Sequence, residues 1–353
     1  MQDFKNFNLF FLVVILFISS CKENKNAVDI NKLTPKNMVW VESKTFLQGA
    51  KNTDQFAMPR EKPAHEVYVD GFFIDITEVT NKQFRNFVNA TNYKTIAERP
   101  INWDEIKKQL PEGTPKPHDS VLKPGSLIFN KDVKAVVNMA NYAQWWTWKV
   151  GANWQHPAGP NSNIIGKENH PVVHVTLEDA QAYCKWANRR LPTEAEWESA
   201  AQGKNKNSIF TWGDNFELLN ENANTWQGVF PVKNESKDGF EFISPVKSYP
   251  PNSIGIYDMT GNVWELTSDF FNVNYYNDID TSKVLQNPKG ATKSFNPGNP
   301  YQIEHVIKGG SFLCHQSYCA SFRISAKMGS EISSGSDHNG FRTVADVEML
   351  TKK

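Results

Sequence analysis

Hydrophobic and polar positions follow two different periods along this chain. From Val67 to Asp75 the residues VYVDGFFID alternate and are rich in β-branched and aromatic side chains. This pattern predicts a pair of strands, or one strand bent at Gly71. Helical spacing appears at three other places, each time after a threonine that is followed three residues later by Gln, Asp or Glu. The helices predicted there run over 81–90, from 176 to 187, and from 193 towards 201.

The remaining segments show no long periodicity. Residues 101–166 carry many prolines and glycines with scattered aromatic residues, including Trp145, Trp146 and Trp148, which predicts an ordered but irregular insert. After residue 201 the chain shows only turns and short strands. With 20 Gly, 19 Pro and 11 Trp, this profile predicts a compact mixed α+β fold with little regular secondary structure, and composition alone leaves open whether it forms one domain or two. Backbone of that kind needs further hydrogen-bond partners, and bound ions often help to supply them.

The first 36 residues differ from the rest. A lysine precedes an uninterrupted apolar run, Phe10–Ile18, which ends in Ser19-Ser20-Cys21. The run is shorter than the roughly 20 residues that span a bilayer, and small residues before a cysteine suit cleavage followed by lipid attachment. We therefore predict a signal peptide over 1–20, a lipid on Cys21 with a flexible tether over 21–36, and a folded domain over 37–353. The alternative is an uncleaved anchor with an incidental cysteine. The protein is exported in either case.

Charge balance excludes one class of partner. The chain has 38 Lys and Arg against 38 Asp and Glu, a formal net charge of zero. Without a basic excess there is no general attraction to nucleic acid phosphates or anionic lipid head groups. We expect no nucleic acid partner, and contact with a membrane only through the lipid on Cys21.

The cysteines carry the most suggestive local chemistry. If Cys21 holds a lipid, only Cys184, Cys314 and Cys319 remain, so at least one thiol must be unpaired. Cys314 and Cys319 follow a glycine pair in the segment KGGSFLCHQSYC. A disulfide is the ordinary state of such a pair in an exported protein, a zinc site lacks two further ligands, and Cu(I) suits two soft thiolates. Spacing alone favours the disulfide, with copper second and zinc last.

Several longer segments resemble one known family. They are HVIKGGSFLCHQSYCASFR with the later HNGFR, HPVVHVTLEDAQAYCKWANRRLPTEAEWE, IYDMTGNVWELTSDFF, and the insert end WWTWKVGANWQHPAGP. From MVWVESKTFLQG near residue 38 to GFRTVAD near 346, the chain is similar to the formylglycine-generating enzymes. These are copper-dependent oxidases that convert a sulfatase cysteine to an aldehyde. LPTEAEWE and GNVWE also occur in relatives that are not oxidases, so they indicate the fold, which is related to C-type lectins. The cysteine pair is the part specific to the activity.

The resemblance implies a particular active site. Cys314 and Cys319 would hold Cu(I), and the substrate cysteine would join as a third sulfur ligand before dioxygen reacts. Hydrogen would leave the substrate β-carbon, and the resulting thioaldehyde would hydrolyse to formylglycine. The substrate would be a sulfatase polypeptide that lies in a cleft and presents a Cys-Xaa-Pro-Xaa-Arg core. Ser311, Trp264 and Tyr318 would line this active site.

Other positions matched to the family concern the substrate and the disulfides. Arg342 on the GFR segment and His315 beside a metal cysteine fall on the substrate-binding side, although His315 receives no firm role. Residue 338 is His where some relatives place Asn, which alters the detail of the peptide pocket. In better-known secreted relatives structural disulfides use the positions that read Ile324 and Thr343 here. Cys184 then has no partner, and we predict a small buried side chain on the apolar face of its helix.

Oxygen-bearing side chains near turns form a second set of candidate ligands. Here the resemblance implies two structural calcium sites, since Ca²⁺ selects side-chain oxygens interleaved with turn carbonyls. The first would use Asn224, Asp238 and the backbone at Thr225 and Phe240, and the second Asp258, Glu265 and the backbone at Gly261 and Val263. Without the family, solvated acidic loops are the simpler interpretation, because neither spacing matches an EF-hand loop.

Three other functions are weighed against this one. The runner-up is a non-catalytic lipoprotein of the same fold, a scaffold or binding component of the cell envelope, in which a disulfide would explain the cysteine pair. An iron-dependent sulfoxide-forming oxidase would need histidines from a further helical domain, and radical maturases would need cluster-binding cysteines that this sequence lacks. We expect a monomer that faces the periplasm or the cell surface, where oxygen and copper are available and where its client arrives after export.

Overall fold

The structure is a computed structural model that describes residues 29–351. The predicted signal peptide, Cys21 and the first part of the tether lie outside the described residues. Among the helices of 29–351, none has the length and apolar character that crossing a membrane requires.

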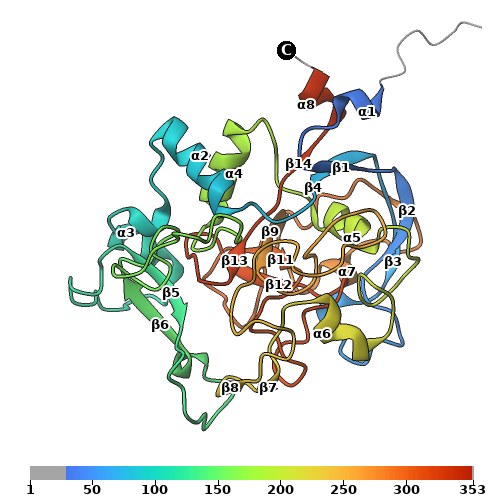
Figure 1. Ribbon diagram of the computed structural model, residues 1–353. Coiled ribbons are helices and arrows are strands. Elements are labelled where there is room, and N and C mark those ends of the chain that lie inside the picture. Colours follow the sequence, from blue (N-terminus) through green and yellow to red (C-terminus); the bar gives the residue numbers. More distant parts are fainter. Residues whose placement is uncertain (1–28, 352–353) are drawn as a thin grey trace, which may run out of the picture.

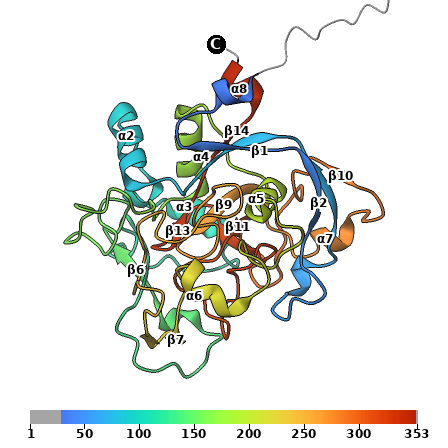
Figure 2. The same ribbon diagram turned by 45° about the vertical axis from the view of Figure 1, so that its right-hand side comes forward.

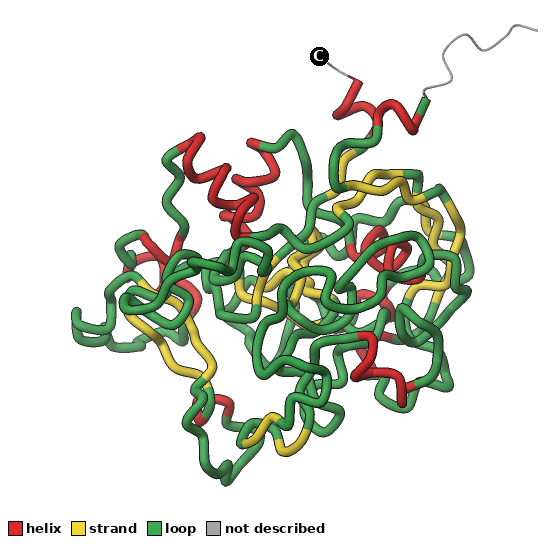
Figure 3. The backbone as a smooth tube through the Cα atoms, viewed as in Figure 1, coloured by secondary structure: helices red, strands yellow, loops and turns green. Residues whose placement is uncertain are grey.

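In this part of the chain, short strands form five small sheets, and the largest lies at the centre of the molecule (Figures 1 and 3). The central sheet has the order β12 (Met328–Glu331), β11 (Glu304–Lys308), β9 (Trp264–Phe270) and β13 (Asn339–Gly340). The second contains β1 (Met38–Val41), β4 (Phe72–Asp75) and β14 (Val344–Ala345), and the third β10 (Leu285–Gln286), β3 (His65–Val69) and β2 (Lys44–Gln48). The two remaining pairs are β5 (Gly125–Phe129) with β6 (Trp146–Val150) and β7 (Gly228–Val229) with β8 (Lys233–Asn234).

The three predicted helices are confirmed as α2 (Asn81–Thr91), α4 (Leu177–Trp186) and α5 (Glu194–Gln202). Each begins with a capping box, in which the threonine hydroxyl accepts a backbone N–H from three residues on and that residue's side chain accepts in return. Helices α2 and α4 pack side by side, and α5 lies against β2, β3 and β9 (Figure 2). The short helices are α1 (Ile30–Leu33), α3 (Trp103–Ile106), α6 (Leu219–Asn222), α7 (Tyr275–Asp278) and α8 (Val347–Thr351).

The segment from Val67 to Asp75 forms two strands, but these strands do not pair with each other. Strand β3 pairs with β2 and β10, whereas β4 pairs with β1 and β14. Gly71 lies between them, and a Cβ there would come within 2.2 Å of the Trp40 ring. The segment is therefore neither a mutually paired hairpin nor one bent strand, because the chain leaves one sheet before Gly71 and enters another after it.

The insert is more regular than its sequence suggested. Strands β5 and β6 form an antiparallel pair within it, and this hairpin lies at one side of the molecule (Figure 1). Trp145 is fully buried at its base in a cluster with Phe129 and Phe230, whereas Trp148 is 37% exposed. This small separate core holds the insert in a fixed place beside the central sheet.

The last part of the predicted tether is folded. Residues 30–33 form α1, whose Ile30 and Leu33 pack in one cluster with Val347 and Leu350 of α8. Figure 1 shows the two helices together at one end of the molecule. The folded region therefore begins before residue 37, because two apolar residues one helical turn apart find an apolar partner helix.

The central sheet positions the residues predicted to be active. Strand β9 begins with the buried Trp264, and β11 ends with Lys308, directly before Gly309 and Gly310. The fully buried Lys308 ammonium donates to Glu198 of α5 at 2.7 Å. This ion pair joins α5 to β11, so the cysteine loop starts from a rigid base.

Candidate active site

A tight turn after β11 starts the loop that carries the two cysteines. Gly309 and Gly310 both adopt positive φ, at 86° and 75°. A Cβ on Gly310 would lie 2.9 Å from the carbonyl carbon of Ser321, so a larger residue would displace the neighbouring backbone. The turn brings the N–H of Ser311 to 3.4 Å from Cys314 Sγ. The segment KGGS thus forms the base of a thiol site.

Cys314 and Cys319 lie side by side. Their Sγ atoms are 2.8 Å apart, with Cys314 buried and Cys319 half-buried. Burial, and after it the contact with Cys319, raises the pKa of Cys314, whereas the hydrogen bond from Cys314 lowers the pKa of Cys319. Either sulfur can be the donor in this contact. Two adjacent sulfurs suit either a soft metal or a disulfide.

Both thiols line a cleft of about 730 Å³. The same cleft is lined by the other residues that the sequence placed in the active site, namely Ser311, Trp264 and Tyr318. The insert contributes one wall through Leu127, Met139, Tyr142, Trp145 and Trp146, and residues around 56–60 and strands β11 and β12 contribute others. The mixed apolar and polar lining and the volume suit a segment of peptide.

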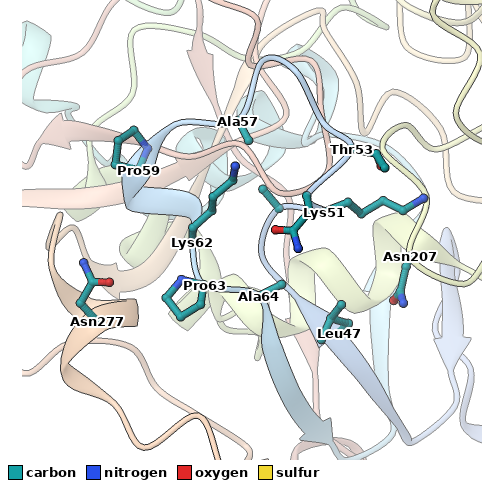
Figure 4. A pocket seen from close by; sticks show the side chains of 12 residues that line it. Leu47, Lys51, Thr53, Ala57, Pro59, Lys62, Pro63, Ala64, Asn207 and Asn277 are labelled. Atoms are coloured by element: carbon teal, nitrogen blue, oxygen red, sulfur yellow. The ribbon is translucent and has the colours of Figure 1, made fainter.

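A second hollow, of about 910 Å³, lies next to Leu47 and the 59–64 segment (Figure 4). Asn207 and Asn277 lie on opposite sides of it in Figure 4. Lys51 at its edge is already paired with Asp214 at 2.7 Å. The described lining offers no carboxylate, imidazole or thiol, so we assign the chemistry to the cleft.

Tyr318 and Trp264 are held in different ways. Tyr318 is 38% exposed, and its ring stacks on Phe230 with centroids 4.5 Å apart and meets the edge of Trp145 at 5.5 Å. Burial raises the pKa of Tyr318 well above its usual range, so the hydroxyl stays protonated. Trp264 is buried, and its backbone N–H donates to the carbonyl of His338 at 2.8 Å. Two aromatic side chains are thereby fixed in the cleft wall.

Arg342 and His315, which we expected on the substrate-binding side, do not line the cleft. Arg342 is fully buried, and its guanidinium donates two hydrogen bonds of 2.6 Å to Glu265. The prediction that Arg342 contacts the peptide was therefore wrong, because the Arg342 charge neutralises Glu265 inside the protein. The His315 ring pairs with Ser317 Oγ at 2.8 Å, and its carbonyl accepts the N–H of Cys319. His315 thus shapes the cysteine loop through its backbone.

Two cleft residues were not among the candidate site residues. Arg60 lines the cleft, donates from Nε to the carbonyl of Lys327 at 2.8 Å, and has its pKa lowered by burial. His338 was noticed only as a departure from relatives, yet it lines the cleft with Nδ1 at 3.2 Å from Ser311 Oγ. Arg60 belongs to no motif and lies far from the cysteines in sequence, so only the fold brings it here. For the wall formed by the insert, the pair Trp145-Trp146 was the available signal.

Comparison with known proteins decides the family. The chain matches the family model of the sulfatase-modifying factor enzyme 1-like domain over residues 24–347. It belongs to the formylglycine-generating enzyme family. The chain is 40% identical to the formylglycine-generating enzyme of Mus musculus over 311 residues, covering 88% of this chain and 75% of that protein. It is also 40% identical to the enzyme of that name from Mycobacterium tuberculosis over 292 residues, 82% and 92% of the two chains.

Other similarities bear on activity and on fold. The inactive C-alpha-formylglycine-generating enzyme 2 of Mus musculus is 34% identical over 338 residues, 95% of this chain and 92% of that protein. Among solved structures, PvdO from Pseudomonas aeruginosa superposes with a TM-score of 0.58 at 20% identity, covering 88% of this chain and 94% of that one. At that identity the likeness concerns the fold alone, and it confirms the α+β fold expected from the sequence.

The residues of the first calcium site expected for this family lie around one carboxylate. Asp238 Oδ2 accepts the N–H of Thr225 at 2.9 Å, and its Oδ1 accepts that of Phe240 at 3.0 Å. The amide nitrogen of Gln227 contacts both Asp238 Oδ2 and the Thr225 carbonyl. Asn224 Oδ1 is buried without a hydrogen-bond partner among residues 29–351. In this set only Asn224 Oδ1 is free to accept a cation, because both Asp238 oxygens and the Thr225 carbonyl already accept hydrogen bonds.

The second expected calcium site fits less completely. Both oxygens of Glu265 are occupied by Arg342, and one also accepts Trp197 Nε1–H at 2.7 Å. Asp258 Oδ1 and Glu78 Oε2, in contrast, are buried without a partner in the described chain. Burial raises the pKa of Asp258 to about 6, and burial together with the Asp258 charge raises that of Glu78. Glu78, which the sequence did not nominate, is therefore better placed than Glu265 to offer a free oxygen.

Cys184 is a small buried side chain, as predicted. It is free and lies in the apolar cluster beneath α4, where burial raises its pKa. The two positions expected to hold disulfides in secreted relatives, Ile324 and Thr343, are also buried. The Thr343 hydroxyl donates to Asp75. Packing and hydrogen bonds occupy these positions instead of covalent links.

Proposed function

We propose that this protein oxidises a cysteine of a sulfatase polypeptide to Cα-formylglycine, within a Cys-Xaa-Pro-Xaa-Arg sequence and with O₂ as co-substrate. The observation that carries the proposal is the Cys314–Cys319 pair, whose sulfurs lie 2.8 Å apart in the wall of a peptide-sized cleft. Family membership alone would not carry it, since one relative of 34% identity is named inactive. Ser311, Trp264 and Tyr318 in the same cleft support the assignment.

We propose Cu(I) as the metal held by Cys314 and Cys319. Groups of three or more His, Cys, Asp or Glu able to hold a metal do not occur among residues 29–351. Two sulfurs without further ligands match Cu(I), which accepts low coordination and prefers sulfur, whereas zinc requires four ligands. When bound, the metal would supply an open position for the substrate thiol and for O₂.

The conversion changes only the β-carbon of the target cysteine. One C–H bond and the S–H bond break and a C=S bond forms, while O₂ takes up the two electrons and two protons as H₂O₂. Water then replaces sulfur, which gives the aldehyde and H₂S. The protein's own part is to bind and orient the peptide and to limit water at the thiols. Trp264 and Tyr318 offer fixed faces for this purpose, and the Ser311 N–H holds Cys314 in place.

We propose that calcium has a structural role near the turns after α6 and before β9. The support is the set of buried oxygens without partners, on Asn224, Asp258 and Glu78. Ca²⁺ takes six to eight oxygen ligands, so backbone carbonyls and water would complete each site. The ion would neutralise carboxylates that otherwise repel one another.

We propose that the protein is exported as a lipid-anchored monomer facing the periplasm or the cell surface. The support is the sequence before residue 29, with its apolar run and Cys21. The client sulfatase would then meet the enzyme after export and before it has folded, because its target cysteine must reach the cleft. Mass spectrometry of fractionated cells tests this, and aldehyde on cytoplasmic sulfatases alone would contradict it.

The second candidate function is a non-catalytic envelope lipoprotein. The observation in its favour is the similarity to a relative named inactive. In that function Cys314 and Cys319 would form a disulfide, so alkylation of the protein as purified would modify neither.

The deciding experiment uses the full chain in detergent, loaded with Cu(I) under air, and a Cys-Xaa-Pro-Xaa-Arg peptide. Aldehyde is detected by mass spectrometry in the wild type, in Cys319→Ser and in Cys184→Ala, a control that removes a thiol outside the cleft. The proposal predicts aldehyde from the wild type and from Cys184→Ala only. An intact peptide despite bound copper would favour the non-catalytic function.

A further inference from the structure

Three methionines, hereafter the three cleft methionines, line the cavity that contains the two thiols. Met58, Met139 and Met328 are 43%, 39% and 37% exposed, whereas the other methionines within residues 29–351 are buried or half-buried. Methionine is among the residues most often found fully inside a protein. The exposed methionines of this part of the chain are therefore gathered at one cavity, whose lining includes Cys314 and Cys319.

Met58 and Met328 come from neighbouring segments of the cleft wall. Met58 directly precedes a short 3₁₀ turn, Pro59–Glu61. In that turn Arg60 donates from Nε to the carbonyl of Lys327 at 2.8 Å. Met328 is the next residue and the first of β12. A direct hydrogen bond therefore joins the two segments that carry these thioethers.

The turn after Met58 is also tied to the end of the cysteine loop. Glu61 accepts two hydrogen bonds from the Arg323 guanidinium, at 2.7 and 2.9 Å, and both side chains are buried. Arg323 lies four residues after Cys319. Because such a two-point ion pair fixes orientation as well as distance, the backbone at Met58 is held in place relative to the thiols.

Met139 belongs to the insert. It lies in the loop between β5 and β6, where the carbonyl of Asn138 accepts the side-chain amide of Gln144 at 2.7 Å. The Asn138 side chain accepts the N–H of Ala140 at 2.9 Å, which closes a turn around Met139. The wall formed by the insert therefore adds a third thioether to the same cleft.

Thioether sulfur is a soft and neutral ligand. Soft sulfur ligands select Cu(I), whereas calcium and magnesium take oxygen. A thioether has no proton to lose and forms no disulfide, so it binds Cu(I) even when a cysteine pair is protonated or oxidised. Neutral thioethers hold the cation more weakly than thiolates, because they lack the negative charge. This order of strength favours movement of the ion from methionines to cysteines.

We propose that the three cleft methionines form a first, weaker Cu(I) site, which captures the ion and passes it to Cys314 and Cys319. The inference rests on the proposed function, because it takes Cu(I) to be the metal of the cysteine pair. Transfer is a ligand exchange without any change of oxidation state. Bonds from the ion to thioethers break, bonds to thiolates form, and each thiol that binds loses its proton to water.

The methionine site is tested without the thiols. The full chain in detergent carries Cys314→Ser and Cys319→Ser and is labelled with carbon-13 at the methionine methyl groups. We expect Cu(I) added without oxygen, or Ag(I) as a redox-inert analogue, to shift the methyl resonances of the three cleft methionines. The resonances of Met38 and Met259, which are buried, should not move.

Capture is tested with the thiols present. Leucine replaces all three cleft methionines, which keeps an apolar side chain of similar volume and removes the sulfur. Cu(I) is supplied as a complex with a coloured chelator, and its transfer to the protein is followed by absorbance. We expect the triple variant to load roughly 10-fold more slowly than the wild type, with a final Kd within about 2-fold. Met349→Leu on α8, outside the cleft lining, is the matched control and should load like the wild type.

Unchanged methyl resonances on adding either ion, or equal loading by the wild type and the triple variant, would overturn the inference. Normal loading by the triple variant with weaker binding of a Cys-Xaa-Pro-Xaa-Arg peptide would also overturn it, since the methionines would then be adaptable peptide contacts. If the wild-type cysteines take up no Cu(I) while the three cleft methionines still respond, the proposed cofactor and the transfer step fall, and the methionine site stands.

Discussion

Two groups of polar side chains around the cysteine loop use their hydrogen-bonding capacity differently. Arg323 lines the cleft but contacts Asp54 at 2.6 Å and Glu61 at 2.7 Å, and all three side chains are buried. Cys319 and His338 line the same cleft, and among residues 29–351 Cys319 has no cationic partner in hydrogen-bond contact and one ring nitrogen of His338 has no hydrogen bond. The hydrogen-bonding groups of Arg323 are occupied by other side chains, whereas Cys319 and His338 retain atoms that can contact a ligand.

This difference teaches how to separate structural from functional polar residues in such a fold. Arg342 belonged to a matched motif and looked functional, yet all its contacts lie in the interior. His338 was noticed only as a departure from relatives in the peptide pocket, yet it lines the cleft and one of its ring nitrogens has no hydrogen bond within residues 29–351. Free hydrogen-bonding capacity next to a cavity is therefore a better guide than membership of a motif.

The largest effect expected is on the cleft side. Cys319→Ser should lower aldehyde formation roughly 1,000-fold or more, about 4 kcal/mol of transition-state stabilisation, because one of two metal-binding sulfurs is lost. The free energy of unfolding should change by less than about 1 kcal/mol, since Cys319 is half-exposed. Aldehyde formation and urea denaturation measure the two effects. A large loss of stability with retained activity would reverse the comparison.

For the Arg323 ion pairs the opposite pattern is expected. Arg323→Met should lower the free energy of unfolding by about 3 kcal/mol or more, because Asp54 and Glu61 would remain buried without a counter-charge. Arg99→Met is the matched control, because it breaks a 2.6 Å pair with Glu178 whose two side chains are 34% and 59% exposed. The control should cost less than about 1 kcal/mol in chemical denaturation. Similar values for both variants would contradict the prediction.

Calcium should stabilise the fold through the buried oxygens that have no hydrogen-bond partner among residues 29–351 and do not line the cleft. At a free Ca²⁺ concentration of about 100 times its Kd, the free energy of unfolding should rise by about 2.7 kcal/mol per site. Asp258→Asn should reduce this gain, whereas Glu235→Gln, which alters an exposed pair with Lys237, should not. Urea denaturation with calcium and with a chelator measures both. A gain that persists in Asp258→Asn would remove Asp258 from the ligand set.

The smallest effect expected concerns pH. Burial, and after it the charge of Glu194, raises the pKa of Asp269 to about 7. Because the folded state then holds a proton that the unfolded state releases, this contribution to stability is lost as pH rises from about 4 to about 7. Between pH 5.5 and 7.5 the loss is about 2 kcal/mol, and Asp269→Asn should remove it. Denaturation at both pH values measures this, and an unchanged slope in the variant would contradict it.

Local patterns predicted much of the framework. The three threonine capping boxes predicted α2, α4 and α5, because the hydrogen bonds that start a helix join residues three positions apart. The glycine pair before Ser311 and the Cys314–Cys319 spacing indicated the site. Cys314, Cys319, Ser311, Trp264 and Tyr318, which the resemblance assigned to one active site, line one cleft, and their roles stay predictions. The Cu(I), calcium and export predictions stay predictions.

The sequence by itself determined the helix starts, the turn before the thiols and the family, since all of these depend on neighbouring residues or on matched motifs. Only the tertiary structure decided that β3 and β4 join different sheets, that Arg342 neutralises Glu265, and that His338 meets Ser311. Each of these contacts joins residues far apart in the chain. Neither side chain of such a pair shows its partner in the sequence, because the pairing depends on how the intervening segments pack.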